Sequence, residues 1–134
     1  KLGKDDAIYG LGDKPGCLNK RGYSYVNWNT DDPAPHVDSF KSLYKSIPFF
    51  IVLGDEYCYG IFADNTYKTT FDFGYENTDY YFVAHEKGEL DYYFMPGNDM
   101  AEVVGLYTSL TGTTPLYQMD IRQPSEPLGL LHAG

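Results

Sequence analysis

The sequence predicts a mainly β protein, an antiparallel β-sandwich with one C-terminal α-helix over residues 99–111 (Asp99 to Thr111). Aromatic residues make up 17% of the 134 residues, with 14 Tyr and 8 Phe, and such residues favour strands. Short apolar segments follow one another with turn residues between them, as in an antiparallel sandwich. A single segment repeats its apolar residues with the period of a helix.

Length and charge limit the class of protein. A chain of 134 residues is one domain that can bury a real core. Its net charge of −9 argues against nucleic acids and anionic membranes as partners, because both repel an acidic protein. No apolar run approaches the roughly 18 residues of a membrane-spanning helix, and no signal peptide is recognisable. The first residue is not Met, which predicts a chain cut from a larger protein.

The two cysteines bear on the compartment. Cys17 and Cys58 stand alone, without a CxxC motif or the spacing of metal ligands. Two free thiols in a reducing compartment are favoured over one disulfide bond. Together with the missing targeting signals, this predicts a cytoplasmic protein.

The first third of the chain contains one clear strand. Residues 7–11 (AIYGL) form a short apolar strand that ends at Gly12-Asp13, and Pro15-Gly16 then turns the chain. Residues 17–46 keep no period of 2 or 3.6. Their interleaved aromatic residues nevertheless predict an ordered loop, because disordered segments are poor in such residues.

From residue 47 the pattern is that of strands. Residues 47–53 and 57–63 flank a short loop that contains Gly54, which predicts a hairpin. Residues 67–73 alternate and end at Gly74. Residues 80–85 and 90–95 then predict a second hairpin around the connection 86–89.

The helix predicted over residues 99–111 has start and stop signals. Asp99 with Glu102 three residues later resembles a capping box, and Gly112 and Pro115 end the helix. Its apolar residues fall on one stripe, which is expected to pack on the sheet rather than to hold a cofactor. That stripe consists of Met100, Val103, Val104, Tyr107 and Leu110.

The candidate site lies in residues 20–46, which hold the single Trp, two adjacent acids and two prolines. The indole of Trp28 suits the C–H face of a sugar, although an indole partly buried against the sandwich edge is the more frequent arrangement. Asp31 or Asp32 can accept hydrogen bonds from ligand hydroxyls. Acids before a proline are more often turn formers, because Asp bonds its own backbone.

Catalysis and metal binding by these residues alone are not expected. A retaining glycosidase needs two carboxyl groups about 5 Å apart, one of them with a raised pKa, whereas Asp31 and Asp32 are adjacent on a polar loop. His36, His85 and His132 are too scattered for a metal site, and no cofactor is expected. Gly10-Leu11-Gly12 lacks the strand–loop–helix setting of a phosphate-binding loop.

Short motifs follow one another in a fixed order over residues 7–116. They are residues 9–13 (YGLGD), 19–22 (NKRG), 28–33 (WNTDDP), 43–49 (LYKSIPF), 59–65 (YGIFADN), 71–74 (FDFG) and 110–112 (LTG). Together these motifs resemble glycoside hydrolase family 31. The resemblance implies the galactose-mutarotase-like N-terminal β-sandwich of an α-glucosidase-like retaining enzyme, whose two catalytic aspartates lie in a following (β/α)8 barrel.

The resemblance assigns roles to the loop. It implies that Asp31 binds hydroxyls of an α-glucoside oligosaccharide beside the cleaved bond. We expect Trp28 to be the packing support of Asp31. Asp32 stands where relatives often differ. Both catalytic aspartates would lie beyond residue 134, so the 134-residue chain is expected to be inactive and to need its own barrel as a partner.

The tail predicts a domain boundary. Residues 1–116 are expected to form the sandwich, whose first strands are not all included, and residues 117–134 depart from the family pattern. One codon choice for residues 119–129, read one base later, gives Trp-Thr-Leu-Gly-Asn-His-Gln-Ser-Arg-Trp-Gly, which resembles the first barrel strand. Met119 before Asp120 forces the leading Trp. A frameshift is therefore hypothesised, and DNA sequencing across the junction tests it.

Two other classes of function stay open from the sequence. One is a free-standing carbohydrate-binding module with Trp28, Tyr23 and Tyr25 as a stacking platform. The other is a structural or interface domain, since aromatic residues often anchor interfaces. In that case the fragment is expected to self-associate. Linkage, sugar and oligomeric state are not readable from the residues.

Overall fold

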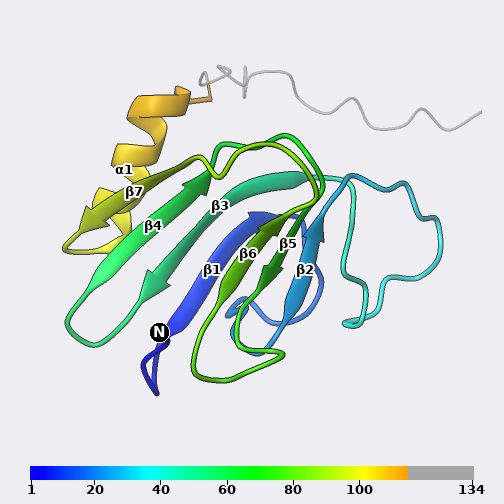
Figure 1. Ribbon diagram of the computed structural model, residues 1–134, viewed down its shortest axis with the longest axis horizontal. Coiled ribbons are helices and arrows are strands. Elements are labelled where there is room, and N and C mark those ends of the chain that lie inside the picture. Colours follow the sequence, from blue (N-terminus) through cyan, green and yellow to red (C-terminus); the bar gives the residue numbers. More distant parts are fainter. Residues whose placement is uncertain (115–134) are drawn as a thin grey trace, which may run out of the picture.

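The structure is a computed structural model that describes residues 1–114, and in that range it contains seven strands and one helix (Figure 1). The elements follow the expected β-rich order with the helix last. They are β1 (Ala7–Gly12), β2 (Ser24–Asn27), β3 (Ser46–Leu53), β4 (Cys58–Ala63), β5 (Thr69–Asp72), β6 (Phe82–His85), β7 (Tyr92–Gly97) and α1 (Met100–Thr111).

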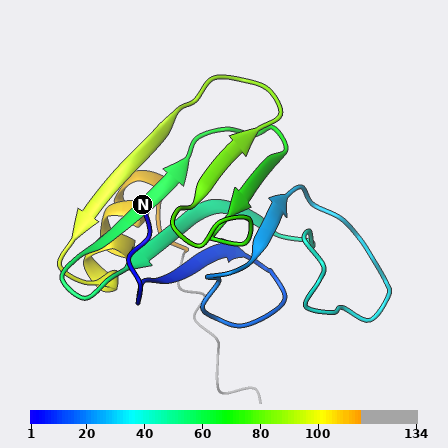
Figure 2. The same ribbon diagram turned by 60° about the horizontal axis from the view of Figure 1, so that its bottom comes forward.

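The strands form two antiparallel sheets. One has the order β1-β3-β4-β7 and the other the order β2-β5-β6. Figures 1 and 2 show the smaller sheet lying over one face of the larger sheet, while α1 lies beside β4 and β7 on the opposite face. The predicted antiparallel sandwich with one C-terminal helix is therefore confirmed.

β3 is buried on both faces, because it lies between the two layers that cover the larger sheet. Phe50 and Val52 point toward the smaller sheet and pack in a core with Tyr25 and Phe71. Phe49 and its alternate neighbours point the other way, into a second core beneath the helix. A strand buried on both faces reads as a continuous apolar run, which is what residues 46–53 (SIPFFIVL) show.

The Gly-Leu-Gly of β1 forms a β-bulge against β3. The register shifts between Gly10 and Gly12, and Leu11 has a positive φ of 70° while its side chain is fully buried. Gly10 has a φ of 130°, and a Cβ there would collide with the backbone of Phe49. Glycine is therefore required for the close approach of β1 to β3.

The helix begins and ends as predicted. The backbone N–H of Glu102 donates to Asp99 Oδ1 at 2.8 Å, so Asp99 is the N-cap. The carboxylate of Glu102 accepts from the backbone N–H of Asn98 at 2.8 Å, one residue before the donor of a standard capping box. At the other end, Gly112 N donates to Thr108 O at 2.8 Å.

The predicted apolar stripe of the helix packs on the sheet only in part. Val103 is buried against the larger sheet, and Tyr107 stacks on Phe49 with ring centroids 4.0 Å apart. The other members of the stripe are exposed. These exposed residues are Met100, Val104 and Leu110.

The predicted hairpin of residues 80–85 and 90–95 is wrong, although both strands exist. β6 pairs with β5, and β7 pairs with β4 in the other sheet. The connection crosses between the layers, where Asn65 Nδ2 donates to the carbonyls of Lys87 and Glu89 at 3.0 and 3.1 Å. The two strands do not pair with each other, because each is an edge strand of a different sheet.

The stretch 17–46 is not loop throughout. It contains β2, which pairs with β5 from Ser24–Asp72 to Asn27–Thr69. Tyr25 on this strand is fully buried and stacks on Tyr23 with ring centroids 5.7 Å apart. Packing against the core thus makes a strand of four residues that show no clear period in the sequence.

Several remaining predictions are tested only in part. Cys17 and Cys58 are free thiols, as predicted. Within residues 1–114, no helix is long and apolar enough to cross a membrane. The predicted tail over residues 117–134, with its frameshift hypothesis, lies outside the described residues.

Candidate functional site

The connection between β2 and β3, residues 28–45, projects away from both sheets (Figures 1 and 2). Hydrogen bonds between its two arms hold its base. The backbone N–H of Val26 donates to Lys41 O at 2.7 Å, and that of Thr30 donates to Leu43 O at 3.2 Å. Ser42 Oγ donates to the carbonyl of Trp28. The segment, named here the β2–β3 loop, is therefore an ordered projection, as the sequence predicts.

Aromatic residues near the tip of the β2–β3 loop contact one another and the backbone of the loop. The ring of His36 is near those of Phe40 and Tyr44, with its centroid 5.8 Å from each. His36 Nε2 lies 3.1 Å from the carbonyl oxygen of Asp32, and Tyr44 OH donates to the same oxygen at 3.2 Å. These contacts fix the backbone beside the acidic pair.

Asp31 and Asp32 differ in their engagement. Asp32 Oδ1 accepts the backbone N–H of Ala34 at 3.0 Å, so Asp32 is the turn former that its place before Pro33 predicts. The side chain of Asp31 is exposed and makes no hydrogen bond within residues 1–114. Of the two carboxylates, Asp31 is the one free to accept hydrogen bonds from a ligand.

A cavity of about 440 Å³ opens at the base of the β2–β3 loop, at the end of the sandwich where β2, β3 and β5 meet. Trp28 lines it and is 54% exposed, so the indole is not packed into the core. Neither Asp31 nor Asp32 lines it. The lining residues carry no charged side chain: Asn27, Trp28, Asn29, Ser46, Pro48, Asn65, Thr66, Tyr67 and Thr69.

Two polar side chains in the lining have no hydrogen-bond partner in the described range. Asn27 is 7% exposed, and neither its Oδ1 nor its Nδ2 is bonded there. Ser46 Oγ is likewise buried and unpartnered. Sequence reasoning missed both residues, because an Asn and a Ser beside a polar loop give no sign of burial.

The stacking platform proposed for a free-standing module does not form. Tyr25 has no exposed surface, and its OH donates to Pro15 O at 2.8 Å. Burial raises the pKa of Tyr25 well above that of an exposed tyrosine. Because Tyr23 stacks on this buried ring, Trp28 is the one member of the trio that lines the cavity.

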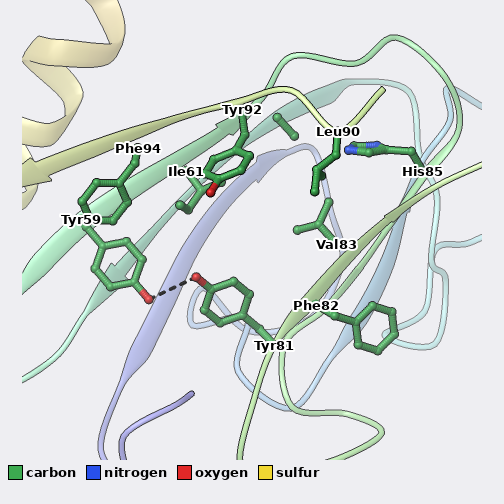
Figure 3. A pocket seen from close by; sticks show the side chains of 10 residues that line it. Tyr59, Ile61, Tyr81, Phe82, Val83, His85, Leu90, Tyr92 and Phe94 are labelled. Carbon is green, nitrogen blue, oxygen red and sulfur yellow. Dashed lines mark hydrogen bonds between the residues drawn. The ribbon is translucent and has the colours of Figure 1, made fainter. Parts of the chain in front are cut away.

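A second cavity, of about 420 Å³, lies between β6 and the inner face of β4 and β7 (Figure 3). It is largely aromatic and apolar, and Tyr59 OH donates to Tyr81 OH across it at 3.3 Å. Tyr92 and Phe94 of β7 stay more than half exposed. The three-stranded sheet is narrower than the four-stranded one, so this cavity is the uncovered margin of the core.

Metal binding finds no support in the described part of the chain. No group of three or more His, Cys, Asp or Glu side chains lies close enough together to hold an ion there. His85, which lines the second cavity, bonds Thr69 Oγ1 through Nδ1 at 2.8 Å.

Known proteins are similar to this chain in sequence. An alpha-glucosidase from Bacillus thermoamyloliquefaciens is 47% identical over 111 residues, which is 83% of this chain and 14% of that protein. The alpha-xylosidase XylQ from Lactiplantibacillus pentosus is 35% identical over 115 residues, 86% of this chain and 14% of that protein. The chain therefore spans about 14% of the length of these relatives.

A solved structure extends the likeness to the fold. A GH31 dextranase from Flavobacterium johnsoniae, complexed with isomaltotriose, has a TM-score of 0.73 and 46% identity, covering 81% of this chain and 13% of the dextranase. The class defined is thus a β-sandwich domain found in larger glycoside hydrolases. The family described as the glycosyl hydrolase 31 N-terminal galactose mutarotase-like domain matches residues 1–72, and the chain belongs to it. The resemblance predicted from the motifs is confirmed.

Proposed function

We propose that this chain is the N-terminal domain of an α-glucosidase-like retaining hydrolase, and that its β2–β3 loop brings Asp31 to the substrate. The observation that supports it is the free carboxylate of Asp31 on a loop whose base and tip are held by hydrogen bonds. An ionised carboxylate on such a loop accepts hydrogen bonds from sugar hydroxyls without first being released from an internal partner.

Trp28 and Asp32 have supporting roles in this proposal. Ser42 Oγ donates to the carbonyl of Trp28 at the start of the loop, and the indole of Trp28 lines the cavity at the base of the loop. Asp32 shapes the turn through Ala34 and contributes a carboxylate that is already partly engaged. The substrate class is an α-glucoside oligosaccharide, in line with the names of the alpha-glucosidase and the dextranase among the relatives.

The catalytic carboxylates are expected in the remainder of the parent enzyme, in a (β/α)8 barrel. Asp31 and Asp32 are adjacent, and Asp32 is committed to its turn, so they do not form the facing pair that retaining hydrolysis needs. The isolated chain is therefore expected not to hydrolyse p-nitrophenyl α-glucoside. Metal-independent turnover by the isolated chain would contradict this part of the proposal.

The test of Asp31 uses the intact enzyme. Asp31→Ala removes one charge-assisted hydrogen bond to substrate, worth roughly 1.5–3 kcal/mol, so kcat/KM is expected to fall about ten- to a hundredfold. Asp38→Ala is the matched control, because Asp38 is another exposed aspartate of the same loop. Both variants are assayed on maltose and isomaltose.

The two variants are expected to differ in kcat/KM. Asp38→Ala keeps the parent kcat/KM, whereas Asp31→Ala does not. If both variants keep the parent kcat/KM, Asp31 is not part of the site. If both lose kcat/KM to the same extent, the charge of the loop matters and the position of Asp31 does not.

A second candidate role, as an interface domain, is favoured by the exposed apolar residues along β7 and α1. Tyr93 on the edge strand is exposed on the helix side of the sheet, where it stacks on Phe62. Val104 and Leu110 on the helix are exposed too. We propose that this surface packs against the barrel in the parent enzyme and leads the isolated chain to self-associate. Light scattering of the chain at increasing concentration tests it, and a monomer throughout would contradict it.

A further inference from the structure

The side chain of Asn27 is buried and makes no hydrogen bond within residues 1–114. Its carboxamide offers two donors and an acceptor oxygen, yet it is 93% buried by its 7% exposed fraction and has no partner within residues 1–114. Buried polar groups are almost always bonded in folded proteins. The amide destabilises the fold as it stands, which is typical of a residue kept for binding rather than for stability.

The residues around Asn27 indicate which class of ligand can bond to its amide. The cavity of about 440 Å³ that it lines has amide and hydroxyl groups but no charged side chain. An anion would find no cation there, and a cation would find no carboxylate. A neutral polyhydroxylated ligand matches it, because each sugar hydroxyl both donates and accepts. The volume falls within the range of small-molecule sites.

Two aromatic rings stand at the rim of the same cavity. Trp28 and Tyr67 are each about half exposed, at 54% and 50%. An exposed ring beside hydroxyl and amide groups offers the C–H face of a sugar an apolar surface to stack on. The combination of stacking surface and neutral polar floor is independent of the Asn27 observation and indicates the same class of ligand.

The walls are held in place before any ligand binds. Asn65 Oδ1 accepts the backbone N–H of Tyr67 at 2.8 Å, and Thr69 Oγ1 donates to Tyr67 O at 2.9 Å. The backbone of Trp28 is bonded by Ser42 on the opposite side. A preorganised wall lowers the entropy that a ligand has to overcome on binding.

We propose that this cavity binds one neutral sugar unit, stacked on Trp28 and hydrogen-bonded through a hydroxyl to Asn27 and Ser46. The amide atoms of Asn27 are closed to solvent, so binding includes a small side-chain adjustment that opens the floor. The site is separate from Asp31, which does not line the cavity. Only the choice of an α-glucoside as the probe rests on the proposed function.

The test titrates the 134-residue chain with isomaltotriose while the fluorescence of Trp28, its single tryptophan, is recorded. A saturable change is expected. Asn27→Leu, which keeps the branched shape and removes the amide, is expected to weaken the affinity at least about tenfold, as for one lost hydrogen bond. The same variant is expected to unfold at an equal or higher urea concentration, since no internal hydrogen bond is lost.

Asn19→Leu is the matched control. The side chain of Asn19 is bonded, because its Oδ1 accepts the backbone N–H of Ile8 at 2.9 Å and of Arg21 at 3.1 Å. This variant is expected to lower the urea midpoint and to leave the isomaltotriose affinity unchanged under conditions where it is folded. The pair thus separates an amide that serves the fold from one that serves binding.

Two results would overturn the proposal. One is the absence of a saturable change in Trp28 fluorescence for the parent chain. The other is a stability loss in Asn27→Leu without any change in affinity, which would make Asn27 a structural residue. Either result leaves the kinetic test of Asp31 in the intact enzyme untouched, so failure of this site and failure of the proposed function are distinguishable.

Discussion

Each end of the β2–β5 pair has a buried polar side chain, but only one of the two is hydrogen-bonded. At one end, Asp72 is 3% exposed, and its Oδ1 accepts the backbone N–H groups of Gly74, Tyr75 and Glu76 at 3.1, 2.9 and 3.3 Å. At the other end, Asn27 is 7% exposed and has no partner within residues 1–114. One end of the ladder is closed by a turn, and the other opens into a cavity.

The presence or absence of internal hydrogen bonds distinguishes a buried polar group that stabilises the fold from one that is available to a ligand. Asp72 Oδ1 replaces the water it loses with three hydrogen bonds from the turn that follows β5. Asn27 loses its water and gains nothing, so its burial is unfavourable by itself. Substitutions at the closed end should therefore destabilise the protein, and substitutions at the open end should not.

The largest effect is expected at the closed end. Asp72→Ala leaves three backbone N–H groups without their charged acceptor and should lower the free energy of unfolding by about 3 kcal/mol or more. Urea unfolding followed by circular dichroism measures it. Asp79→Ala, an exposed aspartate in the next turn, is the control and should be nearly neutral. A neutral Asp72→Ala would break the comparison.

An intermediate effect is expected at Tyr25, which lies on the same face of β2 as Asn27 but is bonded. Tyr25→Phe loses the hydrogen bond to Pro15 O and should lower stability by about 1 kcal/mol at pH 7.

Burial of Tyr25 also makes the stability of the protein depend on pH in the alkaline range. Burial raises its pKa in the folded chain, whereas in the unfolded chain a tyrosine ionises near pH 10, at about its ordinary pKa. The unfolded state then binds fewer protons, so stability is present below about pH 10 and is lost as the pH rises further. Urea midpoints measured from pH 7 to 11 should fall less steeply in Tyr25→Phe. The pKa of Tyr59 is raised chiefly by burial too, so part of the slope remains. Parallel curves would contradict the assignment.

The smallest effect is expected at the open end. Ser46→Ala removes a hydroxyl that has no partner in the described range, so the free energy of unfolding should change by less than about 0.5 kcal/mol. Ser42→Ala removes the hydroxyl bonded to Trp28 O and should lower it by about 1 kcal/mol. Thermal unfolding of the two variants side by side measures the difference. If Ser46→Ala is the more harmful, the cavity lining is part of the folded core.

Part of the fold was predictable because its signals are local. The hairpin of β3 and β4 has a short turn at Gly54, and the helix has its cap at Asp99 and its stop at Gly112, as predicted. β2 was missed, because four residues are too few to show a period and Tyr25 forms strand only by packing into the core. The wrong hairpin has a similar cause, since β6 and β7 are neighbours in sequence but join different sheets.

The candidate site was predictable to the same extent. Trp28 and Asp31 could be singled out because an aromatic ring and a carboxylate on a Pro-containing loop are recognisable in the sequence. Asn27 and Ser46 could not, since their importance lies in burial without a partner. That property depends on how β2, β3 and β5 come together at one end of the sandwich.

The sequence by itself determined the β-rich composition, the turns, the helix ends and the ordered motifs that define the family, because these depend on residues close together in the chain. Only the tertiary structure decided which sheet each strand joins, that Tyr25 is buried, and that Asn27 faces a cavity. The physical reason is that strand pairing and burial depend on contacts between residues far apart in sequence, such as Asn27 with Thr69. No local pattern encodes such a contact.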